Sequence, residues 1–345
     1  MNILVTGGSG YIGSHTLIEL SSAGYDFIVY DNLSNSSQES LKRVSKIIDK
    51  SIIFEEGDIR DPTKLKELFS KYTIDSVIHF AGLKSVGESV SKPLEYYDNN
   101  VVGTLKLLEI MKDFNCKKIV FSSSATVYDE VDEKNYKPLT ESNSTGNTIN
   151  PYATSKYTIE RILEDLYISD NSFKIAILRY FNPVGAHDSG IIGEDPNGMP
   201  NNLMPFISQV AVGKLECLNV FGNDYDTHDG TGVRDYIHVV DLACGHVKAI
   251  EHINSSKDMK PIIVNLGTGK GYSVLDVVKS FEKVSEKKIP KKLAQRRVGD
   301  IAKYYADPSY AKEIFGWTAE RSLETMCKDS WRWQNSNPNG YKGKI

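Results

Sequence analysis

The sequence predicts an α/β fold in which a doubly wound parallel sheet is followed by a smaller C-terminal α/β lobe. Three features of the 345 residues support this prediction. Short β-branched runs alternate with helical periodicity over the first half, which is the order of right-handed strand–helix–strand crossovers. A glycine-rich segment, residues 7–13, separates the first run from the first helix. From residue 183 to residue 205 the chain becomes irregular and rich in Gly, Asn, Asp and Pro, which indicates a change of unit.

The individual elements follow from the apolar runs. Six runs are expected to be strands, at residues 2–6, 27–30, 52–54, 76–80, 118–121 and 175–179. Helical periodicity predicts helices that include residues 11–23, 65–71, 101–114, 239–253, 274–286 and 323–334. Gly24 is expected to end the first helix, because glycine adopts the left-handed backbone at little cost. We expect two domains, residues 1–182 and 183–345, with part of residues 236–270 packing back on the first.

Composition and charge restrict the function. The chain is 40% hydrophobic and 25% charged, as in soluble globular proteins, and its net charge of −4 argues against a nucleic-acid partner. No run approaches the roughly 18 apolar residues of a membrane helix, so no membrane partner is expected. The first residues lack the basic segment of a signal peptide, and the four cysteines form no C-x-x-C pair. We therefore expect a cytoplasmic protein with reduced thiols. Scattered single histidines and an acidic loop without EF-hand spacing predict no metal site.

Residues 6–13 read TGGSGYIG, the pattern of a dinucleotide-binding loop. Gly7 permits a tight turn, Gly10 lets the backbone approach a pyrophosphate, and Gly13 allows close packing of helix on strand. The start of the helix offers free N–H groups and the positive end of its dipole to phosphates. Because a strand precedes the loop and a helix follows it, a Rossmann-type dinucleotide site is favoured over a plain turn.

Two carboxylates follow later strands at the same edge of the predicted sheet. Asp31 closes the second strand, 18 residues after Gly13, where it can accept both ribose hydroxyls of an adenosine and would repel a 2′-phosphate. This position favours NAD over NADP. Asp58 lies after the third strand, where an adenine amino group can be met. A helix-cap or turn role stays open for Asp31, and a turn role for Asp58.

One helix is expected to carry a tyrosine and a lysine into a site. Asn150 is a good N-cap and Pro151 a good first residue, so the helix begins there. Tyr152 and Lys156 are four residues apart and share a face with apolar positions 159, 163 and 166. An isolated Y-x-x-x-K pair is usually a surface pair. The glycine loop upstream and the serines at residues 122–124, after the fifth strand, favour a catalytic pair here.

The chemistry expected of this pair is acid–base catalysis. An unperturbed tyrosine, with a pKa of about 10, is a poor base at neutral pH. A nearby ammonium, the positive end of the helix dipole and an oxidised nicotinamide would each lower the pKa of Tyr152. The phenolate could then take a proton from an alcohol while hydride leaves the same carbon.

Together these residues resemble the extended branch of the short-chain dehydrogenase/reductase superfamily, and longer motifs resemble its UDP-glucose 4-epimerase family. The motifs are FSSSATVY at residues 121–128, RYFNPVGAH at 179–187, PNNLMP at 200–205, GNDY at 222–225 and DGTGVRDYIHV at 229–239. Co-linear motifs of this kind run almost from end to end of the chain and are highly specific. The resemblance implies an NAD-binding Rossmann domain at residues 1–182 and a UDP-sugar-binding lobe at residues 183–345.

The resemblance also implies which residues form the site. Tyr152 would be the catalytic acid/base with Lys156 as its partner, and Ser124 would orient or relay the proton of the sugar 4-hydroxyl. Arg234 and Arg297 suit a pyrophosphate, although without the resemblance either could be a surface ion-pair partner. Contacts to NAD are implied for Gly7, Gly10, Tyr11, Ile12, Gly13, Asp31, Asn32, Asn35, Asp58, Ile59, Phe80, Ala81, Gly82, Lys84, Asn99, Ser122, Tyr152, Lys156 and Phe181. Contacts to the UDP-sugar are implied for Ser124, Tyr152, Asn182, Asn202, Leu203, Asn219, Phe221, Arg234, Arg297, Asp300 and Tyr304.

The reaction implied by the resemblance interconverts UDP-galactose and UDP-glucose in galactose metabolism. It proceeds by transient oxidation at sugar C4 with tightly bound NAD, rotation of the 4-keto sugar and return of the hydride to either face. A nucleotide-sugar 4,6-dehydratase is the nearest alternative, but such enzymes place an Asp-Glu pair where this chain has Ala125 and Thr126. A non-catalytic NAD-binding regulator is the other alternative. It would tolerate loss of the tyrosine, lysine or serine, all of which are present.

Two finer expectations follow from the same resemblance. The position of Tyr304 lies beside the sugar C2 substituent in the family, and a bulky side chain there leaves little room for an N-acetyl group. We therefore expect a preference for UDP-glucose and UDP-galactose over their N-acetylated forms. The resemblance also implies a homodimer joined through helices of the first domain, here residues 101–114 and 157–169.

Overall fold

The computed structural model describes residues 1–129, 136–297 and 300–342. The chain divides into two compact units. The first unit comprises residues 1–130, 141–180 and 243–264, and the second comprises residues 131–140, 181–242 and 265–345. Within the described residues, none of the helices combines the length and the hydropathy that a bilayer crossing requires.

The first unit is built on a seven-stranded parallel sheet, which confirms the predicted fold class. The strand order is β10-β6-β5-β4-β1-β2-β3. The order reverses between β1 and β4, and ligands of such sheets bind at this switch point, beyond the carboxyl ends of the strands. The strands are β1 (Asn2–Thr6), β2 (Asp26–Asp31), β3 (Ile53–Glu56), β4 (Ser76–His79), β5 (Lys118–Ser124), β6 (Lys174–Tyr180) and β10 (Ile262–Leu266).

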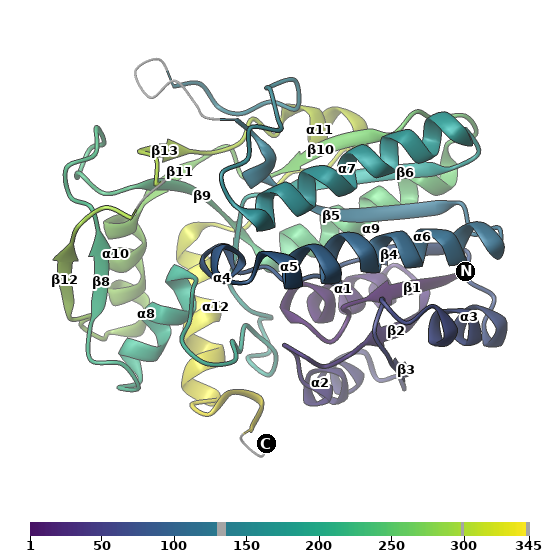
Figure 1. The fold of residues 1–345 in the computed structure, drawn as a ribbon. Coiled ribbons are helices and arrows are strands. Elements are labelled where there is room, and N and C mark those ends of the chain that lie inside the picture. The colour runs from purple at the N-terminus through teal and green to yellow at the C-terminus, as the bar shows by residue number, and fades with distance from the viewer. Residues whose placement is uncertain (130–135, 298–299, 343–345) are drawn as a thin grey trace. The chain divides into compact units, whose positions relative to one another are not determined.

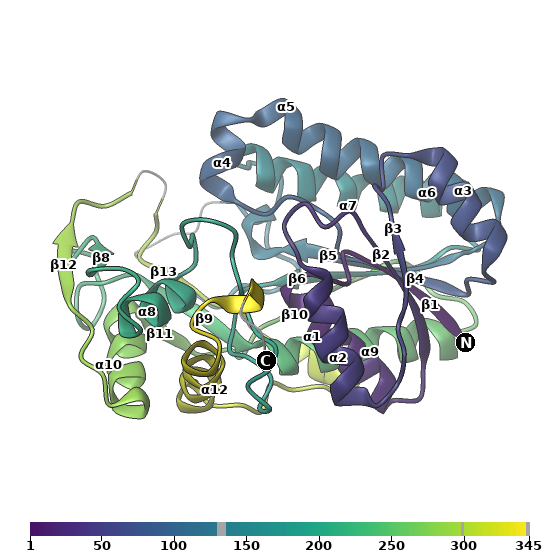
Figure 2. The ribbon, with the colours of Figure 1, turned by 90° about the horizontal axis from the view of Figure 1, so that it is seen from below.

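Helices cover both faces of this sheet (Figures 1 and 2). On one face lie α3 (Pro62–Lys71), α6 (Gly103–Asp113) and α7 (Pro151–Ser169), and on the other lie α1 (Tyr11–Ser22), α2 (Gln38–Ile48) and α9 (Val239–Ser255). The first face is sealed by an apolar core that includes the fully buried Leu65, Leu107 and Leu163. Shorter helical pieces are α4 (Val86–Ser91), α5 (Pro93–Tyr96), the π-helical turn η1 (Tyr97–Val102) and the 3₁₀ turn η2 (Ala125–Val127).

The predicted ends of two helices are confirmed by their backbone. Asn150 caps α7 by accepting a hydrogen bond from the Ala153 N–H at 2.9 Å, and Pro151 is its first residue. Gly24 follows α1 with a φ of +80°, the left-handed conformation that stops a helix. The start of α7 and the end of α1 could therefore be predicted from the residues at these positions alone.

Other boundaries differ from the predicted ones. The strand predicted at residues 118–121 continues to Ser124, because Ser122, Ser123 and Ser124 pair with Leu178, Arg179 and Tyr180 of β6. The serines are thus part of β5 and do not follow it. The helix predicted at residues 101–114 begins instead with the π-helical turn η1. Strand β10 was not predicted, although the turn-forming residues of NSSKDMKP at 254–261 separate it from the preceding helix.

The second unit consists of short strands and helices. Strand β9 (Val233–His238) pairs with β7 (Asn182–Val184), β11 (Gly271–Ser273) and β13 (Lys303–Tyr304), and β8 (Leu218–Phe221) pairs with β12 (Lys291–Ala294). Helices α8 (Leu203–Ala211), α10 (Val274–Ser285) and α12 (Leu323–Ser336) share an apolar core that contains Ile207 and Phe281. Helix α11 (Ser309–Phe315) and the turn η3 (Gly340–Lys342) complete the described part of this unit.

Candidate active site

The glycine loop lies at the switch point of the sheet. Gly7 has a φ of +70°, and a Cβ on it would come within 2.7 Å of the Ala81 nitrogen, so the loop after β1 touches the segment after β4. A Cβ on Gly13 would lie 2.5 Å from the Gly7 carbonyl oxygen, because α1 starts directly against the loop. A Cβ on Gly10 would meet only that same oxygen, at 3.2 Å, so this side of the loop is open. These three positions behave as a phosphate-binding loop requires.

The donor groups of this loop fit a bound pyrophosphate. Gly10 is the N-cap of α1 and has no side chain to cap it, and the first turn carries no acidic residue. The backbone N–H groups of Tyr11, Ile12 and Gly13 therefore begin a helix whose positive dipole end is uncompensated by its own side chains. The Ser9 hydroxyl is buried and has no hydrogen-bond partner among the described residues. An orphaned hydroxyl beside an open glycine loop fits a cofactor that would complete its hydrogen bonding.

Asp31 is already engaged by the protein. Its Oδ2 accepts the Ser9 N–H at 3.0 Å, and its Oδ1 accepts the Leu33 N–H at 2.9 Å and the Ser36 hydroxyl at 3.0 Å. A carboxylate offers about four acceptor positions, so about one is left. The structure thus shows the turn role that the sequence left open. The contact of Asp31 with ribose hydroxyls stays a prediction, and accepting both hydroxyls would require one of these bonds to yield.

Asp58 and Asn32 are brought together at the ends of β3 and β2. The Asn32 side-chain amide donates to Asp58 Oδ2 at 2.9 Å, and the Arg60 guanidinium donates to both carboxylate oxygens at 2.9 and 2.7 Å. Arg60 is the main reason that the pKa of Asp58 lies far below its ordinary value. Asp58 is therefore a charged acceptor over the whole physiological range.

The remaining predicted cofactor residues of this unit lie around the same edge. Gly82 faces α7, since a Cβ on it would lie 3.8 Å from Lys156 Nζ. Ile59 is buried and packs against Gly103 of α6, so its side chain belongs to the core. Asn35 and Lys84 are exposed on the segments after β2 and β4, while Phe80, Ala81 and Asn99 are partly buried.

Tyr152 and Ser124, the predicted acid–base residues, lie next to each other. Both lie in the first unit, and their side chains are hydrogen-bonded to each other. Ser124 Oγ also accepts the Thr126 N–H at 3.2 Å and contacts the Thr126 hydroxyl at 3.0 Å. Ser124 is buried, whereas Tyr152 is only partly buried. A proton on the phenol thus has a hydroxyl next to it through which it can be passed or oriented.

Lys156 is buried one helical turn beyond Tyr152. Its Nζ donates to the Ser122 carbonyl oxygen at 2.6 Å and lies 4.9 Å from the centre of the Phe121 ring. Burial lowers the pKa of Lys156 to about 8, because an ammonium loses hydration in the interior. The lysine is therefore mostly protonated at neutral pH and close to losing its charge just above it.

The protein's own groups shift the pKa of Tyr152 upward, and the lowering expected with an oxidised nicotinamide beside it stays a prediction. Burial raises the pKa of Tyr152 above its ordinary value, and the hydrogen bond from Ser124 only partly opposes this. The reason is that desolvation disfavours the phenolate more strongly than one hydroxyl stabilises it. The phenol is neutral in this state, so a phenolate would need a further positive charge next to it.

Asn100 is a site residue that the sequence reasoning missed. It is 1% exposed and lies in the π-helical turn η1. Its Nδ2 donates to the Leu83 carbonyl and to Ser155 Oγ, both at 3.0 Å, and its Oδ1 accepts the Leu83 N–H at 2.8 Å. This amide ties the segment after β4 to α7, next to Lys156. The only available signal was its place beside the predicted Asn99.

In the second unit the structure brings the predicted charged residues together. Arg297 donates to both carboxylate oxygens of Asp300 at 2.7 and 3.2 Å, and Arg234 Nη2 lies 3.8 Å from Asp300 Oδ1. Arg234 is anchored by donating to the Val233 and Ile301 carbonyls, both at 2.9 Å. Two guanidinium groups around one carboxylate form a cationic cluster that can bind phosphate oxygens bidentately.

Aromatic side chains flank this cluster. The Arg297 guanidinium lies 5.1 Å from the centre of the Phe221 ring, and Phe221 is 38% exposed, an unusual fraction for such a side chain. Tyr304 pairs with Arg234 across β13 and β9, and its ring lies 5.9 Å from that of Phe181. An exposed aromatic face beside arginines suits stacking with a planar base.

Other predicted residues of this unit are not linked to the cluster by any described contact. Asn202 is the N-cap residue of α8 and donates to Glu194 Oε1 at 2.8 Å, while Leu203 packs on the apolar core. Asn182 is exposed on β7, and Asn219 lies on β8 two residues before Phe221. Their contacts with a UDP-sugar stay predictions.

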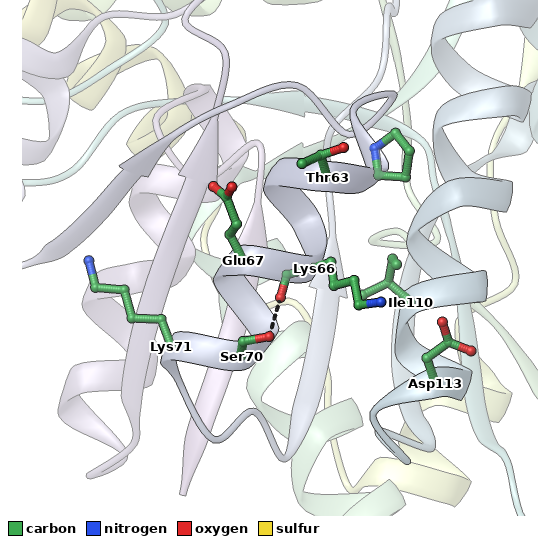
Figure 3. Close-up of a pocket in the computed structure, with 8 residues that line it drawn as sticks. Thr63, Lys66, Glu67, Ser70, Lys71, Ile110 and Asp113 are labelled. Carbon is green, nitrogen blue, oxygen red and sulfur yellow. Dashed lines mark hydrogen bonds between the residues drawn. The ribbon is translucent and has the colours of Figure 1, made fainter.

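A groove between α3 and α6 lies outside all these residues (Figure 3). It has a volume of about 660 Å³ and is lined by Pro62, Thr63, Lys66, Glu67, Ser70, Lys71, Ile110 and Asp113. Its charged side chains come from the solvent-facing sides of two helices. Ligand sites are usually concave and apolar with a few converging polar groups, and this groove lacks that character.

One cluster could hold a metal ion by geometry. The ligand atoms of His228, Asp229 and Asp276 all lie within 4.8 Å of one another. The carboxylates already serve the protein, since Ser273 donates its hydroxyl to Asp229 and its N–H to Asp276 in the capping box of α10. The cluster is explained by this cap, and the absence of a metal site stays a prediction.

The strand order, the glycine loop at the switch point and the Tyr152–Lys156 pair define a Rossmann-type short-chain dehydrogenase/reductase. Comparison with known proteins agrees. A family profile described as GDP-mannose 4,6 dehydratase matches residues 4–330. A UDP-glucose 4-epimerase of Pasteurella multocida (strain Pm70) is 60% identical over 342 residues, which cover 99% of this chain and 100% of the relative. The human UDP-glucose 4-epimerase is 56% identical over 345 residues, with 98% of each chain covered.

A solved structure points the same way. The UDP-glucose 4-epimerase of Bifidobacterium longum, in complex with NAD+ and UDP, is 54% identical and superposes with a TM-score of 0.94, covering 99% of this chain and 100% of that one. This chain therefore belongs to the UDP-glucose 4-epimerase family.

Proposed function

We propose that this chain interconverts UDP-galactose and UDP-glucose by inverting carbon 4 of the sugar with bound NAD. The observation that carries the proposal is the arrangement of Ser124, Tyr152 and Lys156 at the end of a Rossmann sheet, in a chain that is 60% identical to an epimerase over almost its whole length. Fold alone would not support a function, but a site with these chemical groups does.

The cofactor residues of this proposal lie in the first unit, apart from Phe181. The loop of Gly7, Gly10 and Gly13 would hold the pyrophosphate, and Asp31 and Asp58 would meet the adenosine half. When bound, NAD supplies a hydride acceptor and donor for the sugar carbon C4. Its positive ring would also supply the additional charge that Tyr152, whose pKa is raised by desolvation, needs to ionise.

The protein's own residues move the proton. Tyr152 takes the proton of the 4-hydroxyl and returns it at the end of the reaction, and Ser124 orients that proton. Lys156 stabilises the phenolate while it carries its charge. In the second unit, Arg234 and Arg297 hold the diphosphate, so that the sugar itself is held weakly enough to present either face.

Two alternatives are less well supported. A 4,6-dehydratase needs an acid and a base where this chain has Ala125 and Thr126, and Ala125 is buried while the Thr126 hydroxyl contacts Ser124. A non-catalytic NAD-binding regulator would not need the catalytic side chains. The family profile carries a dehydratase description, yet the curated relatives at 55–60% identity are epimerases.

The decisive experiment is to incubate the purified chain with UDP-galactose and follow the sugar by NMR. We expect UDP-glucose to form without net production of NADH. A 4-keto-6-deoxy product would instead identify a dehydratase, and tight UDP binding with no product would identify a regulator. UDP-N-acetylglucosamine tests the role of Tyr304: we expect slower turnover than with UDP-glucose, and comparable turnover would contradict that role.

The assembly and location are part of the same proposal. A homodimer through residues 101–114 and 157–169 is supported by the exposed apolar side chains of Val102, Leu105 and Ile168 in or next to these segments. Sedimentation of wild type and of Leu105→Glu would test it. Wild type should sediment as a dimer, and the variant, with a charge in the proposed interface, should sediment as a monomer. The four cysteines are all free thiols, which supports a reducing compartment such as the cytoplasm.

A further inference from the structure

Three consecutive serines of β5 contact three successive turns of α7. The Ser122 carbonyl accepts from Lys156, Ser123 Oγ donates to Glu160 Oε1 at 2.5 Å, and Ser124 bonds to Tyr152. Because Tyr152, Lys156 and Glu160 are spaced by four residues, they stand one above another on the same helical face. The end of β5 is thus joined to α7 at the two catalytic side chains and at a third, acidic one.

The third side chain belongs to a buried ion pair. Arg179 of β6 donates from Nε to Glu160 Oε1 at 3.0 Å and from Nη2 to Oε2 at 2.6 Å. The Glu160 side chain is 2% exposed and the Arg179 side chain 3%, and the Arg179 guanidinium lies 4.7 Å from the centre of the Tyr128 ring. Two parallel charge-assisted bonds in the interior hold the carboxylate in one geometry. Glu160 is therefore a fixed negative charge one turn beyond Lys156.

We propose that Glu160 is a positioning residue for the catalytic pair. Its carboxylate, held by Arg179 and Ser123, keeps the Lys156 ammonium charged and holds β5 in register with α7. The inference rests on the proposed catalytic role of Lys156.

The electrostatics around Lys156 support this role. Burial lowers the pKa of Lys156 to about 8, and the Glu160 carboxylate opposes that effect. From β4 the lysine faces His79, which is neutral because burial lowers its pKa to about 3. From β6 come Arg179 and the phenol of Tyr180, whose pKa is raised far above its ordinary value, so it carries no charge either. Loss of the Glu160 carboxylate would therefore remove the charge that opposes the effect of burial on Lys156, whether or not Arg179 is present.

The test is the pH profile of UDP-galactose turnover in Glu160→Gln. In wild type we expect kcat to fall on the alkaline side near pH 8, where Lys156 loses its proton. In Glu160→Gln this alkaline limb should move to lower pH by about one unit, with KM changed by less than about twofold. In the single variant Arg179 is left buried without its carboxylate, which can prevent folding. The double variant Glu160→Gln/Arg179→Met removes that guanidinium as well, and its alkaline limb should also move to lower pH.

A matched control lies on the same helix. Glu164→Gln removes an equal charge one turn further on, from an exposed pair with Arg161, and should leave the limb in place. Folded Glu160 variants with an unmoved limb, or a wild-type profile without an alkaline limb between about pH 7 and 9, overturn the inference alone. Absence of wild-type turnover at every pH overturns the proposed function and this inference with it. The two failures are therefore distinguishable.

Discussion

The polar groups around Tyr152 and those around Asp300 are built in opposite ways. In the first unit Lys156, Glu160 and Arg179 are at most 5% exposed. Lys156 donates to the Ser122 carbonyl at 2.6 Å, and Arg179 donates to Glu160, also at 2.6 Å. In the second unit the Arg297 side chain is 57% exposed and shares the Asp300 carboxylate with Arg234.

This contrast indicates that the two sets of residues have different functions. Buried, bonded groups are costly to disturb, because each loss leaves a partner unsatisfied in the interior. Exposed pairs are worth little by themselves and can exchange a carboxylate for a phosphate at low cost. We therefore expect substitutions in the first set to act on turnover and stability, and substitutions in the second set to act on ligand affinity.

The largest effect that would test this contrast is expected from Tyr152→Phe. The variant removes the proton carrier while keeping the ring, so kcat for UDP-galactose should fall by about 10²- to 10⁴-fold. The dissociation constant of UDP, measured by calorimetry, should change by less than about twofold. Tyr167→Phe on the same helix is the control and should keep normal turnover. Near wild-type turnover of Tyr152→Phe would remove the basis of the contrast.

The next largest effect concerns the rigidity of the glycine loop. Gly7→Ala places a Cβ 2.7 Å from the Ala81 nitrogen at a φ of +70°, so it combines a backbone clash with left-handed strain. Gly24→Ala has a φ of +80° and nothing within 4 Å, so only the strain applies. We expect urea denaturation to show a loss of about 1–2 kcal/mol for Gly24→Ala and about 2–4 kcal/mol for Gly7→Ala. Equal losses in the free energy of unfolding would mean that the glycine loop shifts to accommodate the added Cβ at little cost.

Arg297→Ala probes the other side of the contrast. Loss of a charge-assisted bond to phosphate should weaken UDP binding by about 10- to 100-fold in calorimetry. At saturating UDP-galactose, kcat should stay within about threefold of wild type, because the proposed role of Arg297 is to bind the diphosphate and not to move the proton. Arg332→Ala, also in the second unit, should bind UDP normally. A fall in kcat with unchanged UDP affinity would reverse the assignment of the two regions.

The last prediction is a pH dependence from the buried region, which is absent at neutral pH and develops only in acid. His79 bridges the Thr6 and Thr104 hydroxyls at 2.7 and 2.9 Å, and burial lowers its pKa to about 3. The unfolded chain protonates this histidine near its ordinary pKa of about 6.5 while the folded chain does not. Proton uptake by His79 in the unfolded chain therefore lowers the free energy of unfolding as pH falls from about 6.5 toward 3, by up to about 1.4 kcal/mol per pH unit.

Variants at two histidines isolate this contribution. His79→Gln keeps a side chain that can donate and accept but removes the titration, so the unfolding free energy should fall less steeply with acid. His228→Gln changes a 58% exposed side chain and should leave the slope as in wild type. An identical slope in all three proteins would show that His79 takes up its proton in the folded state.

Much of the site could be predicted because its signals are local. The glycine spacing, the Asn150 cap, the Pro151 start and the four-residue step from Tyr152 to Lys156 all follow from helix and turn geometry within a few residues. The pairing of Asp300 with arginines was also within reach, since Arg297 lies three residues away. The Glu160–Arg179–Ser123 contacts were not, because they join three elements whose sequences carry no common period.

The sequence by itself determined the start of α7, the end of α1 and the approximate place of the first six strands, which face of α7 is polar at its start, and which side chains are available for chemistry. These properties depend on backbone sterics and hydrogen bonds between near neighbours. Only the tertiary structure decided that Ser122, Ser123 and Ser124 lie within a strand against α7, that Asp31 is largely occupied, and that burial raises the pKa of Tyr152. Those properties depend on which distant segments exclude water from a group, and a linear pattern does not contain that information.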